Sequence, residues 1–203
     1  MAKKVIIITG PIGSGKSSAT KYLSDLGFKT IDLDMVSNNI LNSFDSLSFL
    51  ENYFPTAVEE NVINKEILAS IVFNDREKLT ILEDFLHPQV LTKLQEIISE
   101  SEGVIFVEVS APRNLQVDFD CLVIIAPEQT RKERLKKRGM EIQDIENRIN
   151  SQKDEKWWIS LGTVLHNQDL NKLYSEIDKY LNTNNIHLAL IFSTDLSNWY
   201  NYS

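Results

Sequence analysis

The segment from residue 5 to residue 27 constrains the fold more than any other part of this 203-residue chain. Residues 10–17 spell Gly-Pro-Ile-Gly-Ser-Gly-Lys-Ser, which satisfies the pattern G-x-x-x-x-G-K-[ST]. The preceding run Val5–Thr9 is rich in β-branched residues without polar alternation, which predicts a strand buried on both faces within a parallel sheet. Helix formers follow from Ser17 to Leu26, up to a plausible stop at Gly27. The chain therefore predicts a strand, a glycine-rich turn and a helix in immediate succession.

This succession is the context in which the motif binds a nucleoside triphosphate, and it disfavours an incidental glycine-rich turn. Glycines allow positive φ and let backbone N–H groups turn inward around phosphate oxygens, and the helix N-terminus adds partial positive charge. Lys16 is predicted to reach the β and γ phosphates, and the Ser17 hydroxyl to ligate Mg²⁺. The predicted nucleotide contacts are Gly10, Pro11, Ile12, Gly13, Ser14, Gly15, Lys16, Ser17 and Ser18.

Three further apolar runs predict strands, at Phe28–Asp34, Val104–Val109 and Leu122–Ala126. Stretches of helical pattern separate the strands, so we predict the α/β class, with a mostly parallel, doubly wound sheet in a three-layer α/β/α arrangement. Between the second and third strands, residues 37–101 show apolar residues at helical spacing on either side of His87-Pro88. We interpret this stretch as a helical insertion that covers one edge of the sheet.

The rest of the chain divides into a charged helical stretch at Glu128–Gln152, a last helix at Asp169–Leu181 and a tail. Within the tail, His187–Phe192 is either a short strand or part of a partly ordered end. We predict one P-loop NTPase domain over residues 1–203. Its parts are a core of about residues 1–36, 102–127 and 163–182, an insertion at about 37–101, a helical lid at about 128–156 and a tail at 183–203.

Composition excludes several classes of protein. The 29 acidic residues exceed the 21 basic ones and give a net charge of −8, which argues against non-specific nucleic-acid binding. A single cysteine, Cys121, and three scattered histidines offer neither a disulfide framework nor metal-ligand spacing. No apolar run approaches the ~18 residues of a membrane helix, and no signal-peptide layout precedes the motif. We expect a soluble cytoplasmic protein without membrane or nucleic-acid partners, and a monomer because no exposed apolar stripe is apparent.

Two carboxylates end the second predicted strand. Asp32 and Asp34 are two positions apart, so both point to one face if the backbone stays extended. There a carboxylate can orient or accept the proton of an attacking hydroxyl, or hold Mg²⁺ through water. The alternative is that either residue caps the following helix. We favour the functional interpretation for Asp34 and leave both open for Asp32.

Arginines gather in the charged stretch that follows Pro127. Arg131, Arg134 and Arg138 recur at spacings of three and four along one stripe of a helix, and Arg148 lies further on. Guanidinium groups suit phosphate binding and can neutralise a phosphoryl group during transfer. Because lysines and glutamates share the segment, a solvated helix face is the alternative.

Glu108, Trp157 and Trp158 are the other residues of note. A glutamate in the third strand could bind Mg²⁺ through water, but its place short of the predicted strand end indicates an incidental polar residue. The tryptophans could wall an adenine pocket, although aromatic residues that follow a charged helix usually anchor it on the core.

From about residue 5 to residue 177 the chain resembles the bacterial dephospho-CoA kinases. The phosphate motif is generic, whereas the ordered combination of His87-Pro88 with Arg148–Gln152 is much more specific. The matching segments are Gly10–Ser17, Leu26–Phe28, Ile31–Asp34, Ile71–Asp75, Leu82-Glu83, His87–Val90, Arg134, Arg138, Arg148–Gln152, Glu155-Lys156 and Val164–Asn167.

The resemblance implies transfer of the γ-phosphate of ATP to the ribose 3′-hydroxyl of dephospho-CoA, which gives coenzyme A and ADP. It implies that the helical insertion receives the acceptor, the small-molecule partner. By the same resemblance the catalytic residues are Asp34, Lys16 and Arg138, further nucleotide contacts are Arg148 and Asn167, and acceptor contacts are Asp34, His87 and Arg134.

Three segments depart from the family's pattern. Ser110–Asn114 stands where the family usually has Pro-Leu-Leu-x-Glu, Asn38 replaces an arginine, and Leu161-Gly162 replaces Ala-Asp. The triphosphate half of the site is intact and the acceptor half is altered, which leaves another small-molecule or nucleoside kinase open. A nucleotide-binding regulatory ATPase is the alternative from a different class, and the sequence contains no Asn-Lys-x-Asp guanine motif.

Overall fold

A five-stranded parallel sheet forms the centre of the computed structural model, which describes residues 4–110, 112 and 119–188. Its order is β2-β5-β1-β6-β7, and every pairing is parallel. The α/β class with a doubly wound sheet is therefore confirmed. The edge strand β7 is absent from the predicted strands. The strands are β1 (Lys4–Thr9), β2 (Lys29–Asp32), β5 (Val104–Glu108), β6 (Asp120–Ile125) and β7 (Thr163–His166).

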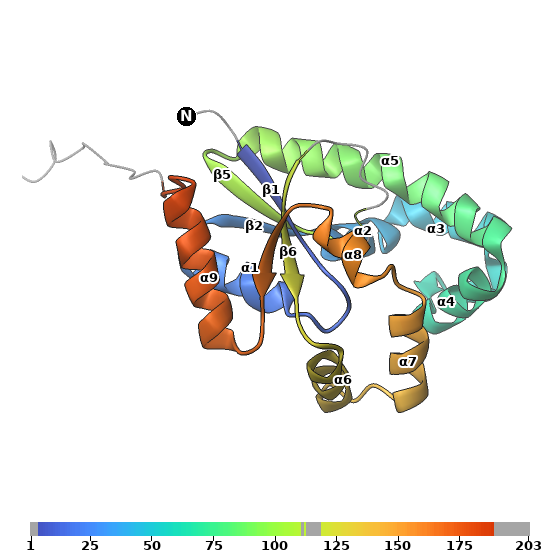
Figure 1. Ribbon diagram of the computed structural model, residues 1–203. Helices are drawn as coiled ribbons and strands as arrows, with labels where there is room; N and C mark the ends of the chain where they lie inside the picture. Colours follow the sequence, from blue (N-terminus) through green and yellow to red (C-terminus); the bar gives the residue numbers. More distant parts are fainter. Residues whose placement is uncertain (1–3, 111, 113–118, 189–203) are drawn as a thin grey trace, which may run out of the picture.

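Helices cover both faces of the sheet (Figure 1). Helices α1 (Lys16–Asp25) and α9 (Leu170–Thr183) lie on one face, and α5 (Arg76–Glu100) packs on the other. Consecutive strand residues point to opposite faces, so the non-alternating runs of β1, β5 and β6 supply apolar side chains to both layers. The first layer includes Ile6, Ile8, Phe106, Leu122 and Ile124, and the second Ile7, Ile105 and Val107.

The insertion has a small core of its own, built around Leu50, Phe54 and Leu68. Helix α5 runs unbroken through Pro88, contributing Leu82 to this core and Leu94 to the sheet layer. Pro88 removes the helical donor to the carbonyl of Asp84, and both residues are exposed. The insertion is thereby fixed to the sheet. Its elements are α2 (Leu33–Leu41), α3 (Phe44–Tyr53), α4 (Lys65–Asn74), α5, a 3-10 turn at Pro55–Ala57 and a hairpin of β3 (Val58–Glu59) and β4 (Val62–Ile63).

The charged stretch after β6 contains α6 (Glu128–Lys137) and α7 (Ile142–Asn150), separated at Gly139, where φ is 83°. The short helix α8 (Glu155–Ile159) follows and carries both tryptophans. Trp158 is buried against Val123 and Ile125 of β6, on the sheet face that α5 also covers. Trp158 therefore anchors α8 on the core, the role that we favoured.

The chain continues to pack on the sheet beyond α9, since Ile186 is buried in the same core as that helix. Residues 187 and 188 form no strand, and the rest of the predicted strand at His187–Phe192 lies outside the described residues. Three residues of the altered segment, at positions 111, 113 and 114, also lie outside them. Within residues 4–110, 112 and 119–188, no helix combines the length and apolar character needed to cross a membrane.

Candidate active site

The glycine-rich turn lies between β1 and α1, as its motif predicts. Gly15 caps α1 in a left-handed conformation with φ of 101°, and a Cβ there would lie 2.0 Å from Asn167 Nδ2. A Cβ at Gly10 would lie 2.2 Å from the carbonyl oxygen of Ile124. Glycine alone fits at both positions. We call this turn, residues 10–17, the cradle, because the first N–H groups of a helix lack helical acceptors and so can bind phosphate oxygens.

Lys16 folds back over the cradle, where its Nζ donates to the carbonyl oxygen of Gly10 at 3.0 Å. Burial lowers the pKa of Lys16, whereas the negative charges of Glu108 and Asp34 act in the opposite direction, and Arg138 lowers the pKa further. The structure thus brings Asp34 and Arg138 into electrostatic range of Lys16. Their catalytic roles stay predictions.

Glu108 is the residue of this site that the sequence analysis missed. It is only 7 % exposed, and its two carboxylate oxygens accept hydrogen bonds from Ser17 Oγ and Thr20 Oγ1, each at 2.9 Å. The prediction of an incidental residue short of the strand end was wrong, because β5 ends at Glu108 and not at Val109. The sequence signal that could have identified Glu108 is a carboxylate within an apolar, buried strand. A buried charge requires polar partners, so such a residue is rarely incidental.

Ser17 and Glu108 fit the Mg²⁺ ion that the motif implies. A serine hydroxyl and a carboxylate meet beside the N-terminus of α1, and both are oxygen ligands of the kind that Mg²⁺ prefers. The ammonium group of Lys16 and the N-terminus of α1 supply positive charge for phosphate oxygens in the same place.

The two aspartates after β2 have different environments. Asp32 caps α2, because its Oδ1 accepts from the N–H groups of Asp34 at 2.9 Å and Met35 at 3.1 Å. Of the two interpretations left open for Asp32, the helix cap is the one that the structure shows. The predicted strand end at Asp34 was wrong, because β2 ends at Asp32 and the chain turns into a helix at Leu33. Asp34 lies exposed in the first turn of α2, with Lys16 within its electrostatic range.

Asn167 and Arg134 hold the cradle from the side of β7. Asn167 is 1 % exposed, and its Nδ2 donates to the carbonyl oxygen of Ser14 at 2.7 Å. Arg134 donates to Asn167 Oδ1 at 3.0 Å and to the same Ser14 carbonyl at 3.2 Å. Both side chains are thus engaged with the protein itself, and their predicted ligand contacts stay predictions. We call this pair the brace.

Gln152 ties the end of the lid to the cradle, since its Oε1 accepts from the N–H group of Ile12 at 2.9 Å. Arg148 lies on α7, where its Nε is 3.3 Å from Asp144 Oδ2 in a half-exposed ion pair. His87 lies partly buried in the middle of α5. The predicted roles of Arg148 at the nucleotide and His87 at the acceptor are not decided by these positions.

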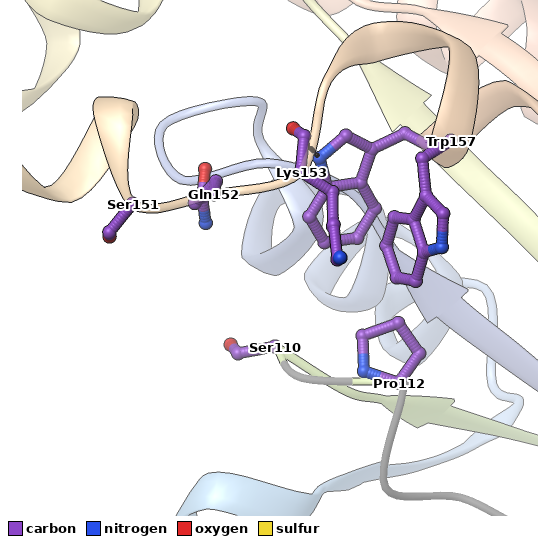
Figure 2. Close-up of a pocket in the computed structure, with 7 residues that line it drawn as sticks. Ser110, Pro112, Ser151, Gln152, Lys153 and Trp157 are labelled. Atoms are coloured by element: carbon purple, nitrogen blue, oxygen red, sulfur yellow. Dashed lines mark hydrogen bonds between the residues drawn. The ribbon is translucent and has the colours of Figure 1, made fainter.

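Two of the altered segments have clear structural consequences. Asn38 Oδ1 accepts from Lys65 Nζ at 2.6 Å, which places a lysine ammonium beside α2. A Cβ at Gly162 would lie 2.3 Å from the carbonyl oxygen of Cys121, so the backbone passes too close to β6 for a side chain. Of the third segment, Ser110 and Pro112 line a pocket together with Trp157 (Figure 2).

The cradle lies at the carboxyl ends of the parallel strands, and Asp34 on α2 and Arg138 at the end of α6 lie within electrostatic range of its Lys16. This arrangement defines a small P-loop kinase. The family model for dephospho-CoA kinase matches residues 4–171. The chain therefore belongs to the dephospho-CoA kinase family, and the resemblance found in the sequence is confirmed.

Individual relatives agree with this membership. The dephospho-CoA kinase of Helicobacter pylori strain J99 is 28 % identical over 193 residues, which cover 89 % of this chain and 97 % of the relative. The crystal structure of TT1252 from Thermus thermophilus superposes with a TM-score of 0.84 at 28 % identity, covering 91 % of this chain and 98 % of that one. A dephospho-CoA kinase structure from Campylobacter jejuni gives a TM-score of 0.60 at 26 % identity, with coverage of 89 % and 97 %.

Proposed function

We propose that this protein transfers the γ-phosphate of ATP to the ribose 3′-hydroxyl of dephospho-CoA, which gives coenzyme A and ADP. Membership of the family over residues 4–171 supports this acceptor. The observation in the site that carries the proposal is the position of Lys16 over the cradle, where its Nζ donates to the carbonyl oxygen of Gly10 and the Asp34 carboxylate lies within its electrostatic range.

The proposed reaction is a direct in-line transfer without a covalent intermediate. Lys16 and the cradle N–H groups hold the phosphates and spread the charge that develops during transfer. Asp34, exposed in the first turn of α2, orients the 3′-hydroxyl and accepts its proton. The carboxylate suits this role because its exposed position leaves it open to an acceptor that approaches from the insertion.

We propose Ser17 as the protein ligand of Mg²⁺, with Glu108 holding the Ser17 hydroxyl in place. When bound, the ion neutralises charge on the phosphate oxygens. Arg138 caps the C-terminus of α6 and is exposed, so its guanidinium is available to the transferring phosphoryl group. Lid closure over the site would exclude water, which would otherwise hydrolyse ATP wastefully.

We further propose that the protein works as a cytoplasmic monomer without membrane or nucleic-acid partners. The net charge of −8 supports the last point, because nucleic acid repels an acidic surface. Size-exclusion chromatography with light scattering would test the monomer directly.

The proposal is tested by measuring ADP release with and without dephospho-CoA. We expect release that depends on the acceptor, and its loss in both Lys16→Ala and Asp34→Asn, with ATP binding retained in the second variant. Loss of a general base typically costs about 10²- to 10⁴-fold in rate. Near wild-type turnover in Asp34→Asn would remove the assignment of the base.

A panel of nucleosides and CoA precursors in the same assay separates the alternatives. Preference for another acceptor would indicate a related kinase, which the altered Ser110–Asn114 segment keeps in consideration. Hydrolysis that does not depend on an acceptor would indicate a regulatory ATPase.

A further inference from the structure

A pocket of about 170 Å³ opens beside the cradle and is not used by the mechanism above. Figure 2 shows the indole of Trp157 and the ring of Pro112 on opposite sides of the opening, with Lys153 directed toward it and Ser110 at its edge. A cavity of about 150 Å³ is known to hold a benzene molecule. The pocket is therefore large enough for a planar ring system with one edge left outside.

The aromatic wall of the pocket is fixed before any ligand binds. Trp158 is 4 % exposed, and its indole N–H donates to the carbonyl oxygen of Lys153 at 3.1 Å. Trp157 stands edge-to-face on Trp158, with ring centroids 4.9 Å apart. A ligand that stacks on Trp157 therefore loses little free energy to ordering of the protein.

The walls of the pocket also contact the phosphate site. Gln152 lines the pocket and accepts a hydrogen bond from Ile12 of the cradle. Ser110 stands two positions after Glu108, which bonds Ser17. Trp158 packs on the sheet face that the insertion helix α5 also covers. The pocket thus lies next to the cradle, on the acceptor side of the molecule.

This position distinguishes the two adenine rings that take part in the proposed reaction. The hydroxyl to be phosphorylated belongs to the same ribose as the acceptor's adenine, so that adenine must lie within one sugar's length of the transferred phosphate. The adenine of ATP is separated from its γ-phosphate by a ribose and two further phosphates. A planar slot whose wall is hydrogen-bonded to the cradle through Gln152 therefore suits the acceptor's base.

Charge agrees with this choice of ligand. Lys153 is exposed, and within residues 4–110, 112 and 119–188 its ammonium group forms no ion pair or side-chain hydrogen bond. An unpaired cation at the mouth of an aromatic slot suits the diphosphate that follows the acceptor's adenosine.

We propose that Trp157 and Pro112 form the slot that holds the adenine ring of the acceptor, with Lys153 facing the acceptor's diphosphate. This inference rests on the proposed function, because it takes dephospho-CoA as the acceptor. It assigns a specificity role to Pro112, one of the positions at which this chain departs from its family.

The test compares Trp157→Ala with wild type in steady-state kinetics. A base stacked on an aromatic side chain is worth about 1–3 kcal/mol, so the KM for dephospho-CoA should rise roughly fivefold to a hundredfold. The KM for ATP should stay within about twofold, and Trp157→Phe should recover most of the affinity. Leu170→Ala is the control, because Leu170 is a 48 % exposed apolar residue on α9 that lies outside both the insertion and the pocket.

Two further measurements keep the proposal falsifiable. Trp157→Leu keeps an apolar side chain against Trp158 but removes the aromatic face, so its KM for dephospho-CoA should rise as predicted for Trp157→Ala. This variant provides the test if Trp157→Ala folds poorly. Binding of 4′-phosphopantetheine, which lacks the base, should be the same in wild type and Trp157→Leu when measured by calorimetry.

A rise in the KM for ATP alone would overturn the proposal, and so would unchanged kinetics in Trp157→Leu. If wild-type protein does not phosphorylate dephospho-CoA at all, the proposed function itself fails, which separates that outcome from failure of the slot.

Discussion

Replacement of Asn167 by alanine would separate a structural role of the brace from direct contact with the nucleotide. The side chain joins three parts of the chain, since it follows β7, donates to the carbonyl oxygen of Ser14 in the cradle and accepts from Arg134 of α6. Asn167→Ala removes both hydrogen bonds at a site that is 1 % exposed. Water therefore has little access to replace them.

The expected loss follows from the two bonds. A bond between neutral groups contributes about 0.5–1.5 kcal/mol, and a bond to a charged group about 1.5–3 kcal/mol. Arg134 keeps its bond to the Ser14 carbonyl, so its guanidinium is not left without an acceptor. We expect the free energy of unfolding to fall by about 2–4 kcal/mol. For a protein of this size that corresponds to a fall in Tm of roughly 5–15 °C.

Urea unfolding without nucleotide measures this loss, and the KM for ATP measures its effect on the cradle. Omission of nucleotide matters because a bound ligand adds to apparent stability. Asn167→Asp is the matched control, since it keeps an acceptor for Arg134 but loses the donor to Ser14. We expect it to retain more stability than the alanine variant while still raising the KM for ATP.

Unfolding of Asn167→Ala within about 0.5 kcal/mol of wild type, the range of an ordinary surface substitution, would contradict the structural role of the brace. A large rise in the KM for ATP without loss of stability would mean that Asn167 touches the nucleotide directly, as the family resemblance implies.

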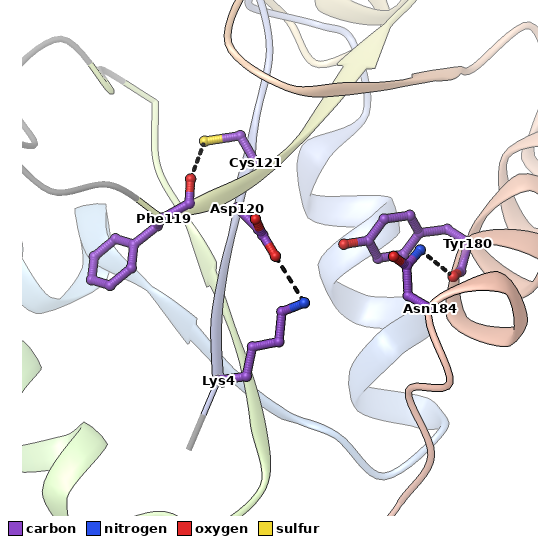
Figure 3. A network of polar contacts seen from close by, with 6 residues as sticks. All are labelled: Lys4, Phe119, Asp120, Cys121, Tyr180 and Asn184. Carbon is purple, nitrogen blue, oxygen red and sulfur yellow. Dashed lines mark hydrogen bonds and ion pairs between the residues drawn. The ribbon is translucent and has the colours of Figure 1, made fainter. Parts of the chain in front are cut away.

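Two more predictions concern Glu108 and Cys121. Glu108→Gln removes a charge but little volume, so we expect a loss of unfolding free energy of only about 1–2 kcal/mol and a clear shift of activity to higher Mg²⁺ concentration; an unchanged Mg²⁺ dependence would contradict the role given to Glu108. Burial and then Asp120 raise the pKa of the Cys121 thiol, whose Sγ lies 3.6 Å from the carbonyl oxygen of Phe119 (Figure 3). The pKa of this thiol is higher in the folded state than in the unfolded state. Its contribution to the free energy of unfolding is therefore fully present below the unfolded-state pKa and is lost as pH rises from there through the folded-state pKa. Iodoacetamide should alkylate folded protein at pH 8 more slowly than urea-unfolded protein, and equal rates would contradict the assignment.

Sequence reasoning located the cradle because its determinants are local. Glycines at fixed spacing, the strand before them and the helix after them all lie within residues 5–27. The role of Glu108 was missed because the end of β5 depends on its pairing with β1 and β2. The sequence of residues 104–109 alone does not reveal these pairings. Sequence reasoning extended β2 to Asp34 because the choice between strand and helix there depends on one capping side chain, Asp32.

The spacing of Arg131, Arg134 and Arg138 indicated one stripe of phosphate-binding cations. In the structure the three side chains have different partners. Arg131 lies 3.4 Å from the carbonyl oxygen of Ile12, and Arg134 donates to that of Ser14, so both are engaged with the cradle backbone. Their charge still acts at the cradle, since Coulomb attraction does not require contact. In the part of the chain that the structure describes, Arg138 forms no ion pair or side-chain hydrogen bond, and it is exposed. Of the three arginines, Arg138 is thus the one whose guanidinium a phosphoryl group could bind without breaking a contact that holds the cradle.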